Sequence, residues 1–167
     1  MIADTGCSYC IVGHSERRHG LNESSEMVAQ KAARAVEGML APIICIGETL
    51  NEQKAGQTFS VLEEQLKPVV TALSQNGAGA VDACIAYEPV WAIGTGLVPA
   101  EKTLAATFAW LHEYISTTKI LTDTTLLYGG SVSEQNGSAI MGIDHVNGLL
   151  IGGASVDFQS FRKIVVL

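Results

Sequence analysis

The segment Ala86-Tyr87-Glu88-Pro89-Val90-Trp91-Ala92-Ile93-Gly94-Thr95-Gly96 joins the end of an apolar run to a carboxylate and a glycine-bearing loop. Pro89 cannot continue a hydrogen-bonded ladder, so the strand ends beside Glu88. Gly94 and Gly96 allow the loop to change shape between its hinges. A carboxylate beside a mobile loop suits a base that is shielded from water during a reaction. A strand-end glutamate followed by an ordinary surface loop is the simpler alternative.

The strand before Glu88 is one of five short apolar runs, and helical periodicity separates them. The runs are residues 9–12, 42–46, 83–87, 125–128 and 148–151. The expected helices are residues 24–37, 57–73, 99–115, 133–141 and 157–164. Strands that alternate with helices predict an α/β fold with a parallel sheet and right-handed crossovers. Pro68 is expected to kink or divide the second helix, and Asp157 to cap the last one.

Composition indicates one domain and limits the classes of partner that the chain can bind. The chain has 167 residues, of which 47% are hydrophobic and 16% charged, and its net charge is −7. This charge argues against a nucleic-acid partner, although backbone amides can bind a small anion in an acidic protein. No apolar run is long enough to span a bilayer and none resembles a signal peptide, so we expect no membrane partner and a cytoplasmic location. Of four cysteines only Cys7 and Cys10 approach a metal-binding spacing, and no second pair or histidine cluster completes a site, so no metal is expected.

Each predicted strand ends in a polar or glycine-bearing turn, and in a parallel sheet these turns share one edge. Two of them, Gly129-Gly130-Ser131 and Gly152-Gly153-Ala154, precede predicted helices. Glycine lets a phosphate approach the backbone, and the start of the following helix supplies N–H groups. Two such turns at successive strand ends predict a phosphate site, to which Gly94 can add a donor.

His14 follows the first strand directly. If Ser15 caps the next helix, His14 lies near the positive helix end and tends to stay neutral, so that it can donate a hydrogen bond to a developing oxyanion. A histidine satisfied by backbone groups is the alternative, and spacing alone favours it. Cys45 has apolar neighbours and is interpreted as core packing or as support for the site. The remaining histidines have no motif context and are expected at the surface: His19, His112 and His145.

Five segments together resemble the triosephosphate isomerase family, in that family's order and over nearly the whole chain. They are Gly13-His14-Ser15-Glu16-Arg17-Arg18, Cys45-Ile46-Gly47-Glu48, the segment 86–96, Tyr128-Gly129-Gly130-Ser131-Val132 and Gly152-Gly153-Ala154-Ser155. The resemblance implies a barrel of strand–helix units, no cofactor, and interconversion of dihydroxyacetone phosphate and glyceraldehyde 3-phosphate through an enediolate. The pairing of a carboxylate base with a neutral histidine is long established for that family.

The resemblance also implies residue roles. Glu88 matches the base, and His14 matches the electrophile that polarises the carbonyl group. Gly94, Ser131, Gly152 and Gly153 match positions whose backbone N–H groups hold the phosphate. Glu16 and Cys45 match supporting positions. The resemblance further implies a homodimer for the complete protein.

The five units resemble units four to eight of the family's eight. We therefore expect residues 1–167 to form a single domain, an N-terminally truncated barrel with two open sheet edges and an uncovered apolar face. The family's strand-end lysine lies in the absent units, so this chain alone is expected to be poorly active or inactive. The alternatives are a non-catalytic, phosphate-binding half-barrel and another phosphate-handling barrel enzyme.

Overall fold

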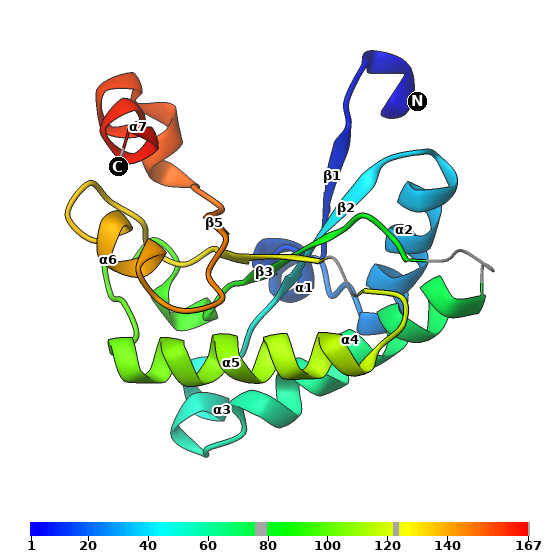
Figure 1. The fold of residues 1–167 in the computed structure, drawn as a ribbon, viewed down its shortest axis with the longest axis horizontal. Coiled ribbons are helices and arrows are strands. Elements are labelled where there is room, and N and C mark those ends of the chain that lie inside the picture. Colours follow the sequence, from blue (N-terminus) through cyan, green and yellow to red (C-terminus); the bar gives the residue numbers. More distant parts are fainter. Residues whose placement is uncertain (76–79, 122–123, 167) are drawn as a thin grey trace.

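A computed structural model describes residues 1–75, 80–121 and 124–166. It contains five parallel strands in one sheet, whose spatial order follows the sequence from β1 to β5 (Figure 1). The strands are β1 (Tyr9–Val12), β2 (Ala41–Ile46), β3 (Cys84–Tyr87), β4 (Thr125–Tyr128) and β5 (Gly148–Leu149). All five predicted strands are therefore present, and the α/β fold class is confirmed. The last strand is shorter than expected, although the Leu150 N–H still donates to the Tyr128 carbonyl at 2.8 Å.

The register of the sheet brings the carboxyl ends of the strands together. Val12 pairs with Ile44, and Tyr87 lies between Ile46 and Tyr128 in neighbouring strands. The ladder continues one residue past β3, because the Glu88 N–H donates to the Ile46 carbonyl at 2.7 Å. The residues that follow each strand therefore gather along one edge of the sheet.

Helices cover one face of the sheet and form the core with it. The long helices are α2 (Ser25–Glu37), α4 (Thr58–Gln75) and α5 (Glu101–Thr117), and the shorter ones are α1 (Ser15–Gly20), α3 (Leu50–Lys54), α6 (Gly137–Met141) and α7 (Phe158–Val165). In Figure 1, α4 and α5 run beneath the sheet. Strand residues such as Ile46 and Tyr87 pack with helix residues such as Leu66, Phe108 and Leu111 in one fully buried cluster.

Local capping sets several helix starts. The Asp157 carboxylate accepts the Ser160 N–H at 2.8 Å, which confirms its predicted role at the start of α7. Thr49 and Glu52 form a capping box that begins α3, a helix that was not predicted from the sequence.

Pro68 does not divide the second long helix, so that part of the prediction is wrong. Pro68 lies inside a single helix, α4, which continues from Thr58 to Gln75. Its buried stripe, Leu62, Leu66, Val69 and Leu73, runs past the proline without interruption. Packing of this stripe against the sheet offsets the hydrogen bond that the proline lacks.

The opposite face of the sheet is open. Tyr9 and Ile11 on β1 are 53% and 48% exposed, whereas Val12 on the helix side is buried. In the described part of the chain, β1 and β5 each pair with one strand only. In Figure 1, β1 lies on one side of the molecule, and β5 and α7 lie on the other, with open space between them. The expected open edges and apolar face are thus present. Among the described residues, no helix is both long and apolar enough to cross a membrane.

Candidate active site

A cavity of about 390 Å³ lies at the carboxyl ends of the strands. Among the residues that line it are six predicted site residues: His14, Glu88, Gly94, Ser131, Gly152 and Gly153. The fold therefore brings these positions together from four separate stretches of the chain. Glu16 and Cys45, predicted as supporting residues, do not line the cavity.

The two groups predicted to carry chemistry face each other. Nε2 of His14 lies 3.5 Å from Oε1 of Glu88. The other carboxylate oxygen of Glu88 accepts the Ser15 N–H at 3.2 Å, at the start of α1. Glu88 is almost completely buried, with 2% of its surface exposed, whereas the His14 imidazole is partly exposed to the cavity.

His14 itself, rather than Ser15, occupies the N-cap position of α1, so the predicted capping role of Ser15 is wrong. Nδ1 of His14 accepts the Glu16 N–H at 3.4 Å. An Nδ1 atom that accepts a hydrogen bond carries no proton, so the neutral ring has its proton on Nε2, the atom that faces Glu88. The side chain of Glu16 is exposed, and its contribution here comes from the backbone.

Burial raises the pKa of the Glu88 carboxyl above its ordinary value. The attraction of His14, the Ser15 N–H and a hydrogen bond from the Cys45 thiol each oppose this shift without cancelling it. A raised pKa moves a carboxylate toward the range in which it works as a base near neutral pH. Burial also raises the pKa of the Cys45 thiol, so the neutral thiol contacts Glu88 and is not a nucleophile.

Glu88 fits into its position because the residues at 47 and 129 are glycines without side chains. A Cβ atom on Gly47 would lie 1.8 Å from the Glu88 carbonyl oxygen, and one on Gly129 would lie 2.8 Å from the Glu88 Cγ atom. The backbones on both sides therefore approach Glu88 more closely than any side chain permits. This close approach holds the carboxylate at one position on the cavity wall.

The loop after Glu88 is anchored to the end of β2 through Glu48. The Trp91 indole donates to Oε1 of Glu48 at 3.0 Å, and the Tyr87 hydroxyl donates to the same oxygen at 3.2 Å. Glu48 is completely buried, and burial raises the pKa of its carboxyl. No role was predicted from the sequence for Glu48. The signals for Glu48 were its place after a predicted strand and its membership of a segment that carries the family resemblance.

Ser131 connects this loop to the first glycine turn. Its hydroxyl donates to the Ala92 carbonyl and accepts the Gly96 N–H, the latter at 3.1 Å. Gly94 and Gly96 have φ angles of 67° and 75°, which only glycine adopts easily. The loop therefore bends over the cavity at two glycines and is held there by one hydroxyl group.

The two glycine turns differ from each other. Gly153 begins a short 3-10 helix (Gly153–Val156), whose first N–H groups have no partner within the helix. The expected helix at residues 133–141 begins only at Gly137. Asn136 explains the difference, because its side chain accepts the Ser133 N–H at 2.8 Å and donates to the Ser131 carbonyl at 3.0 Å. These bonds replace those of a first helical turn.

Known proteins resemble this chain over nearly its whole length. The family model described as triosephosphate isomerase matches residues 1–167. The chain belongs to the triosephosphate isomerase family. It is 43% identical over 169 residues to triosephosphate isomerase from Lawsonia intracellularis and 42% identical over 167 residues to that from Aquifex aeolicus. Each match covers 99% of this chain and 66% of the relative. The chain thus spans about two thirds of the length of these relatives, and its five-stranded sheet corresponds to a partial barrel of this family.

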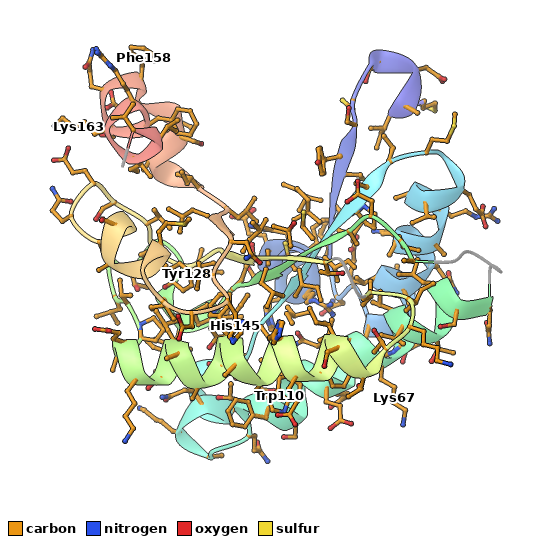
Figure 2. All side chains as sticks on the ribbon, in the orientation of Figure 1. Lys67, Trp110, Tyr128, His145, Phe158 and Lys163 are labelled. Carbon is orange, nitrogen blue, oxygen red and sulfur yellow. The ribbon has the colours of Figure 1, made fainter. Side chains whose placement is uncertain are left out.

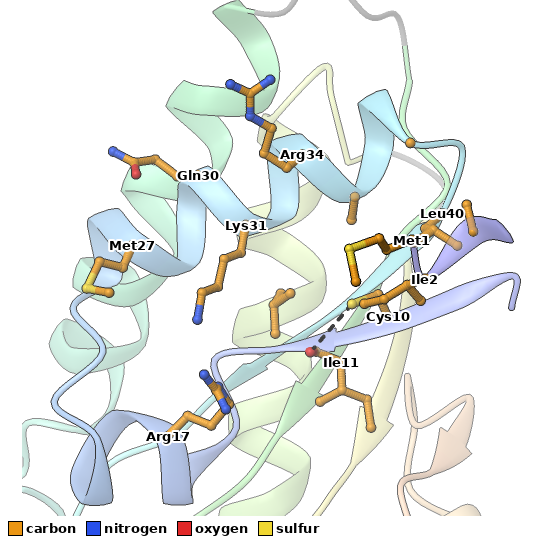
Figure 3. Close-up of a pocket in the computed structure, with 14 residues that line it drawn as sticks. Met1, Ile2, Cys10, Ile11, Arg17, Met27, Gln30, Lys31, Arg34 and Leu40 are labelled. Carbon is orange, nitrogen blue, oxygen red and sulfur yellow. Dashed lines mark hydrogen bonds between the residues drawn. The ribbon is translucent and has the colours of Figure 1, made fainter. Parts of the chain in front are cut away.

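A larger cavity, of about 840 Å³, lies along the free edge of β1 and beside α2 (Figure 3). Its walls are mainly apolar and include Ile11 and Met27. Its cationic side chains are engaged elsewhere, because Arg17 and Lys31 both pair with the buried carboxylate of Glu23. None of the described residues that line it is an acid or a histidine, whereas His14 and Glu88 both line the smaller cavity, which is therefore the candidate active site.

Proposed function

We propose that this chain carries the catalytic site of a triosephosphate isomerase, which interconverts dihydroxyacetone phosphate and glyceraldehyde 3-phosphate in glycolysis and gluconeogenesis. The observation that supports this proposal best is the contact of 3.5 Å between His14 and Glu88 in a cavity that glycine turns also line. The substrate is a small phosphorylated triose, and no cofactor is required.

In this proposal Glu88 removes a proton from the carbon next to the substrate carbonyl and returns it to the neighbouring carbon. Its raised pKa favours this exchange near neutral pH. His14 donates from Nε2 to the carbonyl oxygen, which becomes negatively charged as the enediolate forms. Because Nδ1 accepts the Glu16 N–H, the imidazole is held in the tautomer that can do so.

The phosphate is proposed to bind the backbone N–H groups of Gly94, Ser131, Gly152 and Gly153. Three of these positions lie after strand ends or at the start of a short helix, where free backbone N–H groups favour an anion. The loop carrying Gly94 then covers the substrate, excludes water and protects the enediolate from losing phosphate. We also propose a cytoplasmic location, a homodimer for the complete protein, and no nucleic-acid or membrane partner.

A phosphate-binding half-barrel without turnover is the second candidate, and one observation favours it. Among the described residues that line the cavity, none is a lysine or arginine. A cation commonly balances the phosphate charge and helps to stabilise a negatively charged transition state. The open edges of the sheet also leave the site less enclosed than a closed barrel would. We therefore expect slow catalysis by this chain alone.

The experiment that separates the candidates follows deuterium uptake. The purified chain is incubated with dihydroxyacetone phosphate in D₂O, and ¹H NMR measures loss of the signal from the carbon-bound proton. Deuterium uptake with formation of glyceraldehyde 3-phosphate is the expected result. Two results together would favour the second candidate. The chain would bind 2-phosphoglycolate without deuterium uptake, and uptake would also fail after addition of a polypeptide that supplies the family's first three units. Rates equal to those of a full-length relative would contradict the expectation of slow catalysis.

A further inference from the structure

Two histidines form a pair far from the candidate active site. His112 on α5 and His145 in the loop before β5 stack with ring centroids 4.1 Å apart and an angle of 12° between the ring planes. Figure 2 shows His145 beside α5. Both side chains are exposed. They lie toward the amino ends of β4 and β5, whereas the catalytic pair lies at the carboxyl ends.

The pair borders a small cavity with its own polar groups. The cavity has a volume of about 230 Å³ and is also lined by Thr124, Ser116 and Asn147. Thr124 is 8% exposed, and its hydroxyl oxygen is buried without a hydrogen-bond partner among the described residues. A buried hydroxyl without a partner is costly, which indicates that this cavity holds water or another polar group. The volume suffices for an ion with water, since a water occupies about 30 Å³.

The acidic character of the chain favours a cation over an anion. Each histidine is adjacent in sequence to an exposed carboxylate, Glu113 after His112 and Asp144 before His145. The whole chain has a net charge of −7. Neutral imidazole is a ligand for borderline transition-metal ions such as Zn²⁺.

We propose that His112 and His145 bind a divalent transition-metal ion at the mouth of this cavity, with water completing the coordination and the Thr124 hydroxyl bonding to a coordinated water. This site is independent of the proposed isomerase function, and it revises the expectation that the chain holds no metal. Within residues 1–75, 80–121 and 124–166, no group of three or more His, Cys, Asp or Glu side chains is arranged to hold a metal. The site therefore has two protein ligands and binds more weakly than a structural zinc site.

The stacked rings must move apart and rotate to reach this geometry, because two near-parallel stacked rings cannot both point a nitrogen at one ion. In a tetrahedral site with metal–nitrogen distances of about 2.1 Å, two coordinated imidazole centroids lie about 5 Å apart. The rings must separate by about 1 Å from their observed 4.1 Å and turn away from parallel. Exposed side chains can do this. The loop itself is fixed, because the side chain of Asn147 accepts the Leu126 N–H at 2.9 Å.

Calorimetric titration with Zn²⁺ tests the proposal on four proteins: the unaltered chain, His112→Gln, His145→Asn and the control His19→Gln. Asparagine is chosen at position 145 because the residue there has a φ of 69°, which asparagine tolerates. All four proteins keep Cys7 and Cys10, so any binding by thiols is common to them. We expect the unaltered chain and the control to bind equally, and each of the other two to bind at least tenfold more weakly.

A measurement on the unaltered chain needs no variant. Zn²⁺ should shift the imidazole ¹⁵N resonances of His112 and His145 and leave those of His19 in place. Equal Zn²⁺ binding by all four proteins, or imidazole signals of the pair that do not respond to Zn²⁺, would overturn the proposal and leave the stack as a packing contact.

Discussion

Nε2 of His14 lies 3.5 Å from Oε1 of Glu88, and the two residues follow strands β1 and β3, which are separated by β2. The Ser15 N–H holds the second oxygen of the same carboxylate at 3.2 Å. The carboxylate therefore rests between the imidazole and the start of α1.

Replacement of Ser131 by alanine is expected to release the loop that carries Gly94. The hydroxyl of Ser131 bonds both the Ala92 carbonyl and the Gly96 N–H, and alanine can make neither bond. Since one hydrogen bond contributes roughly 1 kcal/mol, we expect about a fivefold to tenfold weaker affinity for 2-phosphoglycolate. Calorimetry measures the affinity, and ¹⁵N relaxation reports the motion of residues 93–97. Ser138→Ala, at an exposed position in α6, is the control, and equal affinities for both variants would refute the tethering role.

Gly47→Ala should strongly destabilise the fold, whereas Gly20→Ala should not. The new Cβ atom at position 47 meets a backbone oxygen at 1.8 Å, while at position 20 nothing lies within 4 Å. Overpacking against a rigid backbone costs about 1–3 kcal/mol, and we expect a value near the upper end. Alanine at the exposed end of α1 should be neutral or slightly stabilising. Urea unfolding measures both free energies, and equal values for the two variants would contradict the structure around Glu88.

Glu48 should make stability depend on pH in a direction opposite to that of a paired surface carboxylate. Burial raises the pKa of its carboxyl above the ordinary value of 4.5. Between the unfolded and the folded pKa, the folded state holds a proton that the unfolded state has lost, so stability falls as the pH rises above about 4.5. Glu48→Gln removes this contribution. Glu88 contributes a slope of the same sign in both proteins and cancels from the comparison.

The measurement for Glu48 is the free energy of unfolding in urea from pH 4.5 to pH 8. We expect the unaltered chain to lose more stability over this range than Glu48→Gln. Parallel curves for the two proteins would show that the Glu48 carboxyl titrates at its ordinary pKa.

The sequence predicted the five strands because each is an uninterrupted apolar run bounded by a polar or glycine turn. The cavity was predictable for the same reason, since parallel strands place their carboxyl ends at one edge. The role of Glu48 was not predictable, because it depends on the Trp91 indole and the Tyr87 hydroxyl meeting one carboxylate in three dimensions. The sequence suggested Ser15 as the cap of α1 because serine is a common cap residue. His14 is the cap instead, because its backbone is not helical and its side chain accepts the Glu16 N–H.

The late start of α6 has a similar origin. A glycine turn followed by Ser133 resembles a helix start. In the structure, however, the Asn136 side chain bonds the Ser133 N–H and the Ser131 carbonyl in place of a first helical turn. The stack of His112 on His145 joins residues of a helix and a distant loop that have no shared motif. Contacts of this kind follow from tertiary packing and leave no local pattern in the sequence.

The role of Glu88 as the base is tested most directly by Glu88→Gln, which keeps the shape of the side chain and removes its ability to take a proton. The rate of deuterium uptake by dihydroxyacetone phosphate in D₂O should fall at least roughly 100-fold. Glu64→Gln, an exposed position on α4, should leave the rate unchanged, and 2-phosphoglycolate should still bind both variants. Deuterium uptake by Glu88→Gln at the rate of the unaltered chain would contradict the proposed function.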